Sequence, residues 1–261
     1  MIRPLLLSFY FIAVKENRGD VLGSLDQFAP LMPPAGRYYA DPFLIENRGV
    51  QYLFFEDFDY KKGVISYVLI EEAGRFSAAQ VALELPVHLS FPSFYQEGEE
   101  IYMIPETYSS QSISLFKAVA FPERWEWQRT LVRGDKFSDP ILFHYDGYYW
   151  IFAAVDRDRL VVFYASALDG PYFPHPINQK RIRGRNAGNI YCDEGRLVRP
   201  TMDCRIRYGR AMVLKEIVLL NPTEFIEKAV GWIEPDWAPG LVGTHTYSRN
   251  RKYVAYDGQL D

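Results

Sequence analysis

The chain has 261 residues, and 29 Lys and Arg against 33 Asp and Glu give it a formal net charge of −4. This balance offers no basic field for nucleic acid. Aromatic residues make up 16% of the sequence beside 18 Gly and 17 Pro, a composition typical of many short strands joined by tight turns, so we expect one all-β domain over residues 1–261.

The first predicted element is the apolar run at residues 5–14. It is too short to span a bilayer, and no small-residue cleavage pattern follows it, so we interpret it as a buried strand. Cys192 and Cys204 form neither a disulfide framework nor a zinc motif. The sequence therefore predicts no transmembrane segment, two free thiols and a cytoplasmic location.

A two-strand unit then recurs along the chain. In residues 138–152, Asp139-Pro140 opens one strand, Asp146-Gly147 makes a tight turn and a second strand follows. Similar units begin, at intervals of 45 to 60 residues, at Asp41-Pro42, Phe91-Pro92, Arg199-Pro200 and Thr244-His245. Propeller blades repeat with a period of about 40–50 residues.

Third strands are indicated at residues 64–71, 112–119 and 160–167. We predict a five-bladed β-propeller with four-stranded antiparallel blades, in which the N-terminal strand completes the last blade and closes the ring. A β-sandwich with coincidental Xaa-Pro strand starts is the alternative. Residues 178–189, rich in Arg and Gly, indicate a long functional loop.

Acidic side chains recur at matching places in these units. The start of the first strand and the end of the second strand of a hairpin share one edge, so we expect these side chains to ring one mouth of the propeller. Hydrolysis or transfer of a glycosyl group needs a carboxylic acid and a carboxylate at such a cleft. The candidates for catalysis are Asp41, Glu106 and Asp139; further carboxylates at strand ends are Glu56, Asp156, Glu216 and Asp257. Glu56 could equally belong to an exposed acidic turn, and Asp257 reads as structural.

A second set of residues is predicted to bind substrate. Arg185 and Arg199 could hold an anionic group such as a uronic acid, a sugar phosphate or a nucleotide sugar, or could neutralise the carboxylates. His88 and His245 are candidate hydrogen-bond donors, and Glu56 and Asp203 complete the set. We expect no cofactor and no catalytic metal, although a structural cation in the funnel is compatible with the carboxylates.

The motif Ala40-Asp41-Pro42 together with Asp139-Pro140 resembles the five-bladed propellers of glycoside hydrolase family 43, in the furanosidase-like superfamily. The resemblance implies that Asp41 is the general base and that Asp139 tunes the pKa of the acid. The family's acid is expected near the start of the following blade, where this chain has Arg199-Pro200. Glu106 is then the best remaining acid.

A closer resemblance covers nearly the whole chain. Several segments are similar to the propeller domain that precedes the transferase domain of plant glucosamine inositolphosphorylceramide transferases: 88–92, 102–106, 175–178, 185–188, 199–203 and 243–247. This resemblance implies a carbohydrate-active propeller and partner enzymes of polysaccharide biosynthesis. The alternative is a non-catalytic saccharide-binding or scaffold domain in polysaccharide or glycolipid biosynthesis.

Overall fold

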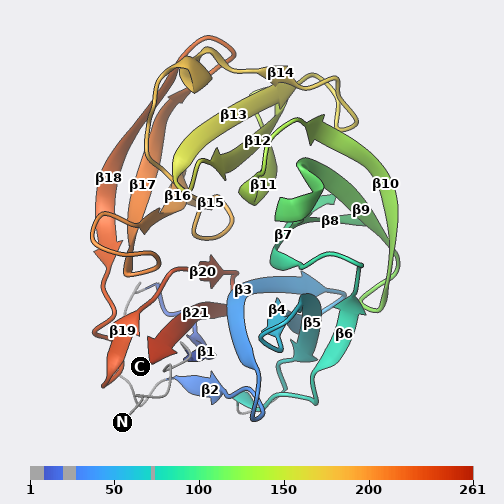
Figure 1. Ribbon diagram of the computed structural model, residues 1–261, viewed down its shortest axis with the longest axis vertical. Helices are drawn as coiled ribbons and strands as arrows, with labels where there is room; N and C mark the ends of the chain where they lie inside the picture. Colours follow the sequence, from blue (N-terminus) through green and yellow to red (C-terminus); the bar gives the residue numbers. More distant parts are fainter. Residues whose placement is uncertain (1–8, 20–27, 72–73, 261) are drawn as a thin grey trace.

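Five antiparallel sheets surround a common axis in the computed structural model, which describes residues 9–19, 28–71 and 74–260 (Figure 1). Four of the blades each hold four strands, paired in chain order. Blade one contains β3 (Tyr38–Asn47), β4 (Val50–Phe58), β5 (Gly63–Leu69) and β6 (Gln80–Leu83). Blade two contains β7 (Ser90–Glu97), β8 (Glu100–Glu106), β9 (Ser112–Ala120) and β10 (Arg124–Arg133). Blade three contains β11 (Ser138–Tyr145), β12 (Tyr148–Val155), β13 (Arg159–Ala165) and β14 (Phe173–Pro174). Blade four contains β15 (Tyr191–Asp193), β16 (Arg196–Asp203), β17 (Ala211–Leu220) and β18 (Phe225–Ile233).

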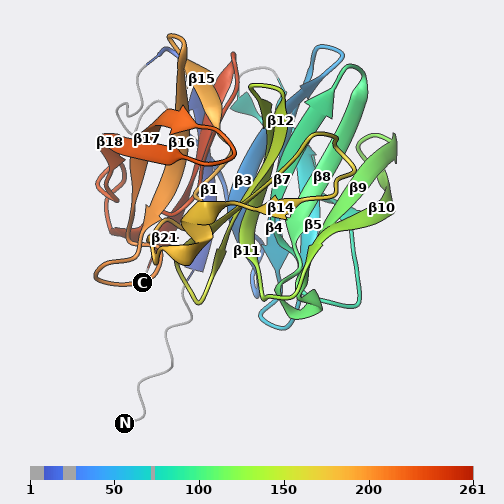
Figure 2. The same cartoon turned by 90° about the horizontal axis from the view of Figure 1, so that it is seen from above.

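Blade five joins the two ends of the chain. Its strands run in the order β19 (Leu241–Gly243), β21 (Tyr253–Leu260), β1 (Phe9–Glu16) and β2 (Ala29–Leu31), and β20 (Tyr247–Arg249) also pairs with β21. β1 and β21 are paired along their full lengths, and Figure 2 shows them side by side. This pairing confirms the predicted ring closure for residues 9–14, whereas residues 5–8 of the predicted strand lie outside the described residues.

The described part of the chain includes two short 3₁₀ turns, η3 (Tyr108–Ser110) and η4 (Pro176–Gln179). No helix in that part has the length and apolar character needed to cross a bilayer.

The blades pack on one another through aromatic side chains. Between blades one and two, the fully buried ring of Phe43 meets that of Phe91 at 4.9 Å between centroids, and Phe54 meets Phe94 at the same distance. Burial of each such ring contributes roughly 1.5–3 kcal/mol, so these aromatic pairs help to join neighbouring sheets.

The predicted hairpin of blade four is displaced by one strand. The tight turn lies at Glu194-Gly195, between β15 and β16, and Arg199-Pro200 therefore lies on the second strand rather than at the head of the first. Residues 185–187 extend the first strand, because Ala187 and Met202 donate their backbone N–H groups to the carbonyls of Pro200 and Arg185. The segment predicted as a long loop thus ends in the innermost strand of blade four.

In the first three blades, the residue before the strand-opening proline lies in a β-bulge. The bulges interrupt the pairing between Ala40 and Phe43, between Ser90 and Ser93, and between Ser138 and Ile141. The bulged residues Asp41, Phe91 and Asp139 have φ angles of 53°, 46° and 48°. Left-handed backbone is unfavourable for these residue types, and it takes their N–H groups out of the strand ladder.

Candidate active site in the funnel

Carboxylates of neighbouring blades accept these displaced N–H groups. Asp41 donates its N–H to Asp257 at 3.3 Å, and Phe91 donates to Asp41 at 3.1 Å. Asp139 donates to Glu106 at 2.8 Å. Each bond crosses from one blade to the next, so hydrogen bonds to carboxyl groups stabilise the strained bulges at the blade joints.

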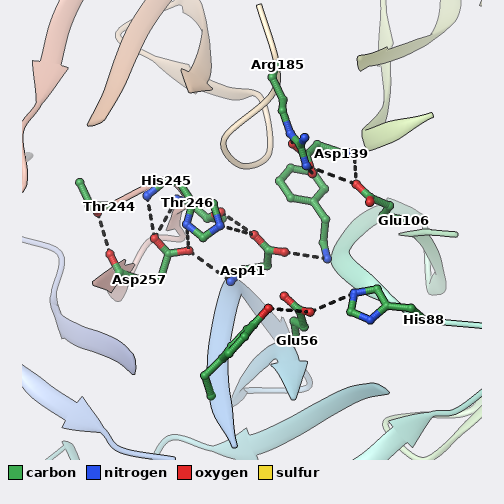
Figure 3. Close-up of polar contacts among 12 residues, drawn as sticks. Asp41, Glu56, His88, Glu106, Asp139, Arg185, Thr244, His245, Thr246 and Asp257 are labelled. Carbon is green, nitrogen blue, oxygen red and sulfur yellow. Dashed lines mark hydrogen bonds and ion pairs between the residues drawn. The ribbon is translucent and has the colours of Figure 1, made fainter. Parts of the chain in front are cut away.

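An imidazole lies between two of these carboxylates. Nδ1 of His245 is 2.6 Å from Oδ2 of Asp257, and Nε2 is 3.7 Å from Oδ1 of Asp41 (Figure 3). Burial is the largest single effect and opposes the charged imidazole, but the carboxylates of Asp257, Asp41 and Asp139 together outweigh it and raise the pKa of His245 to about 9. His245 is therefore an imidazolium at neutral pH.

Asp41 is the central carboxylate of the funnel. Its Oδ1 accepts a hydrogen bond of 2.7 Å from the hydroxyl of Thr246. Burial raises the pKa of Asp41 to about 7, although the charge of His245 acts in the opposite direction. A carboxyl group with this pKa changes its charge near neutral pH, as a general acid or base must.

Glu106 and Asp139 share one cation. Arg185, from the start of the innermost strand of blade four, makes a two-pronged ion pair with Asp139 and lies 3.7 Å from Glu106 (Figure 3). Burial, followed by the negative charge of Asp139, raises the pKa of Glu106 well above its usual range. The guanidinium of Arg185 opposes this shift and holds Asp139 in place.

Glu56 lies on the other side of the mouth, with His88. The Nε2 atom of His88 is 3.1 Å from Oε1 of Glu56, and Nδ1 accepts the N–H of Gly63 at 2.9 Å. The bond from Gly63 assigns the proton of neutral His88 to Nε2. The hydrogen bond to Glu56 raises the pKa of His88. The bond from Gly63 acts against this, because a protonated Nδ1 could no longer accept the N–H of Gly63. Glu56 is buried within β4, so the expectation of an exposed acidic turn is wrong for this residue.

The β16–β17 connection reaches into the same region. The guanidinium carbon of Arg185 lies 5.0 Å from the ring centroid of Tyr208, whose ring is 5.6 Å from that of His245. Thr244 donates its N–H to the carbonyl of Gly209. The connection therefore packs against the mouth, with Tyr208 still 40% exposed.

Arg199 does not join this cluster. It is fully buried in blade four, where two nitrogens bond to Glu227 and the third bonds to the carbonyl of Gly184 and the side chain of Asn186. All three guanidinium nitrogens have partners within the blade and the side chain is fully buried, so Arg199 does not reach an anionic group in the funnel as predicted from sequence, and its place is structural.

Three further carboxylates pair with cations of their own: Asp203 from the predicted substrate-binding set, and Asp156 and Glu216 from the predicted ring. Asp203 pairs with Arg205 at 2.9 Å, exposed Asp156 pairs with Arg159, and Glu216 lies on the third strand, where it pairs with Lys228. Asp257 belongs to β21 rather than to a turn, and its side chain accepts backbone N–H groups of His245, Thr246 and Asp41.

One trio of described side chains could hold a metal ion. Single ligand atoms of Asp41, His245 and Asp257 lie within 4.8 Å of one another. In the present arrangement the imidazolium occupies the space between the carboxylates, so a cation would compete with the charge of His245. The structural cation remains a prediction.

The chain is a five-bladed β-propeller with a buried acidic mouth, and solved glycoside hydrolases share this fold. At a TM-score of 0.67, the chain is similar to the catalytic domain of the family 62 α-L-arabinofuranosidase of Coprinopsis cinerea, with 11% identity over 97% of both chains. The family 117 glycoside hydrolase Zg3597 of Zobellia galactanivorans matches with a TM-score of 0.61 and 13% identity over 95% of this chain and 90% of that one. These likenesses bear on the fold alone.

Sequence comparison assigns the family. Residues 32–237 match the model described as glucosamine inositolphosphorylceramide transferase 1, N-terminal, and the chain belongs to that family. It is 31% identical over 209 residues to glucosamine inositolphosphorylceramide transferase 1 of Oryza sativa subsp. japonica, and 29% identical over 208 residues to that of Arabidopsis thaliana. Each match covers 74% of this chain but only 28% and 27% of the relatives, so the chain spans about a quarter of their length.

Proposed function

We propose that the funnel mouth binds a saccharide or activated sugar and acts on its glycosidic bond. Asp41 is the base in this proposal, Glu106 is the acid, and Asp139 tunes Glu106. The supporting observation is that two buried carboxyl groups, Asp41 and Glu106, both have raised pKa values beside an Asp139 that Arg185 holds. A carboxyl group that keeps its proton at neutral pH can act as the acid, and one whose pKa is near 7 can act as the base.

The proposed step uses one proton at each carboxyl group. Protonated Glu106 gives its proton to the leaving oxygen as the glycosidic C–O bond breaks. Ionised Asp41 takes a proton from the attacking water or acceptor hydroxyl as the new C–O bond forms. The two groups then exchange protons with solvent to restore the starting state.

The relatives support this proposal by their names. The family model is described as glucosamine inositolphosphorylceramide transferase 1, N-terminal, and the structural neighbours include an α-L-arabinanase with bound arabinohexaose and an α-L-arabinofuranosidase. Sugar chemistry is common to both groups.

The test is turnover of aryl glycosides and nucleotide sugars by Asp41→Asn and Glu106→Gln variants. We expect losses of about 10²–10⁴-fold, the usual contribution of a positioned acid or base. Asp169→Asn is the matched control, because Asp169 is an exposed carboxylate that pairs with Arg129 on β10, the outermost strand of blade two. Turnover by Asp41→Asn at the wild-type rate would refute the proposal.

A second candidate is a saccharide-binding domain without turnover. It is favoured by the use of Asp41, Glu106 and Asp257 as acceptors for backbone N–H groups at blade joints. This candidate predicts binding by calorimetry in the absence of any product. It also predicts that Glu106→Gln, which keeps an acceptor oxygen, still binds the same sugar.

A further inference from the structure

The cations inside the mouth are already neutralised. Arg185 pairs with Asp139 and Glu106, and His245 with Asp257. An anionic group entering the funnel would therefore meet carboxylates without a free positive charge. The interior is suited to a neutral sugar ring, and any anionic group of a ligand needs partners elsewhere.

Such partners lie on the rim formed by blades three and four. Three segments carry arginines at short intervals: residues 156–159, 181–185 and 205–210. We call them the arginine rim; its members are Arg157, Arg159, Arg181, Arg183, Arg185, Arg205, Arg207 and Arg210. These charges oppose the sign of the whole chain, whose net charge is −4.

The fold brings these segments together. Leu160 donates its N–H to the carbonyl of Ile182, and Gly184 donates to that of Asp158, both at 2.8 Å. Arg185 also reaches the carbonyl of Arg157, at 3.5 Å. The third segment joins them at a cavity of about 180 Å³, which is lined by Arg183, Arg205, Lys215, Asp158 and Asp203 among others.

Part of the rim has no carboxylate partner. Among the described residues, Arg157, Arg181 and Arg207 form no ion pair, and Arg183 meets Asp158 only at 3.6 Å with 72% of its side chain exposed. Arg207 stands next to Tyr208, which contacts Arg185 and His245, and its charge acts on Tyr10 of blade five. Free guanidinium groups thus stand beside an acidic funnel.

We infer that the arginine rim binds a phosphate group carried by the saccharide whose ring enters the funnel, with Arg157, Arg183 and Arg207 as its donors. This inference rests on the proposed sugar-binding role of the mouth. Guanidinium groups bind phosphate through paired, charge-assisted hydrogen bonds, and several of them can surround its oxygens. The ligand class is therefore a phosphorylated sugar rather than a neutral glycan.

The test is calorimetric titration of the whole protein with five probes: glucose, glucuronate, glucose 1-phosphate, UDP-glucose and glycerophosphoinositol. The first two separate the sugar ring and a carboxylate from phosphate. The last three present phosphate as a monoester, a diphosphate and a phosphodiester headgroup. We expect a phosphorylated probe to bind most tightly, and its affinity to fall with added salt.

The double variant Arg157→Gln/Arg207→Gln should weaken that probe about tenfold or more, because two charge-assisted contacts are lost. Arg48→Gln/Arg251→Gln is the matched control: it removes two exposed arginines from hairpin turns at the opposite edge of the blades. The control should bind like the wild type. Circular dichroism establishes that both double variants are folded.

Two results would overturn the inference. One is glucuronate binding as tightly as the phosphorylated probes, which would assign the rim to a carboxylate. The other is phosphate-probe binding that the rim variant leaves unchanged. In either case, loss of turnover in Asp41→Asn would leave the proposed function standing. Failure of that function would instead appear as turnover that survives Asp41→Asn.

Discussion

Replacing Arg199 by Met tests how blade four holds the funnel together. Methionine fills a similar volume but removes the cation that pairs with Glu227 and the donors to Gly184 and Asn186. The side chain of Glu227 is only 9% exposed, so its charge is left buried with Lys215 as the remaining partner. Breaking a buried ion pair by removing one partner costs about 3–5 kcal/mol.

A loss of this size is a large fraction of the 5–15 kcal/mol that typically stabilises a folded domain. Urea unfolding at pH 7, followed by tryptophan fluorescence, measures it directly. Arg196→Met is the control, because Arg196 is 46% exposed and its ion pairs with Asp193 and Glu194 are at 3.6 Å and 3.5 Å. Exposed pairs of this kind contribute roughly 0–1 kcal/mol.

The double variant Arg199→Met/Glu227→Met sharpens the test. It removes both charges of the pair, so its loss of stability should be clearly smaller than the sum of the two single losses. A loss below about 1 kcal/mol for Arg199→Met would refute the reasoning, since that is the range of an exposed pair. So would additive effects of the two substitutions.

Three further predictions concern the funnel. The pKa of His245 is raised in the folded protein to about 9, so protonated His245 stabilises the fold fully below its unfolded pKa of 6.5, and this stabilisation is lost as the pH rises through 9. The difference in urea-unfolding free energy between wild type and His245→Gln should therefore shrink by about 3 kcal/mol from pH 6 to 10. A constant difference would contradict this assignment. If Asp41 is the base, kcat/KM should fall below about pH 7, where its carboxylate gains a proton; a rate independent of pH from 5 to 8 would exclude that role. Gly188→Ala should lower the melting temperature strongly, because an added Cβ would lie 1.8 Å from the carbonyl oxygen of Tyr247. Gly195→Ala has open space around it and should cost only about 1–2 kcal/mol, the cost of a side chain at its left-handed φ. Equal shifts in the two variants would count against a steric cause.

The fold was predictable because its signals are local and repeated. Each of the hairpins around Asp146-Gly147 and Arg48-Gly49 is specified by its own turn and by the strand-opening proline. The strands of blade four were assigned wrongly from sequence, because Arg199-Pro200 has the pattern of a strand start. The actual turn, at Glu194-Gly195, lies just before it. A proline on a second strand gives the same local pattern as one on a first strand.

The sequence predicted where the candidate site lies but not which side chains contact one another within it. Strand register brings Asp41, Glu106 and Asp139 to one mouth, and the sequence pattern indicated this. The partners of these groups come from distant segments: Thr246 is 205 residues from Asp41 along the chain, and Arg185 is 46 residues from Asp139. No periodicity encodes such contacts. Their catalytic roles stay predictions.

The hydrogen bonds that join bulged amides to carboxylates have a consequence for how such a mouth can evolve. The carboxyl groups proposed to react also accept the hydrogen bonds that join two blades. A substitution at Asp41 or Glu106 therefore changes the contact between two sheets as well as the reacting groups. If the enzymatic role were lost, selection would still keep these acids because they join neighbouring blades. Their persistence in a relative would not by itself reveal whether that relative is an enzyme.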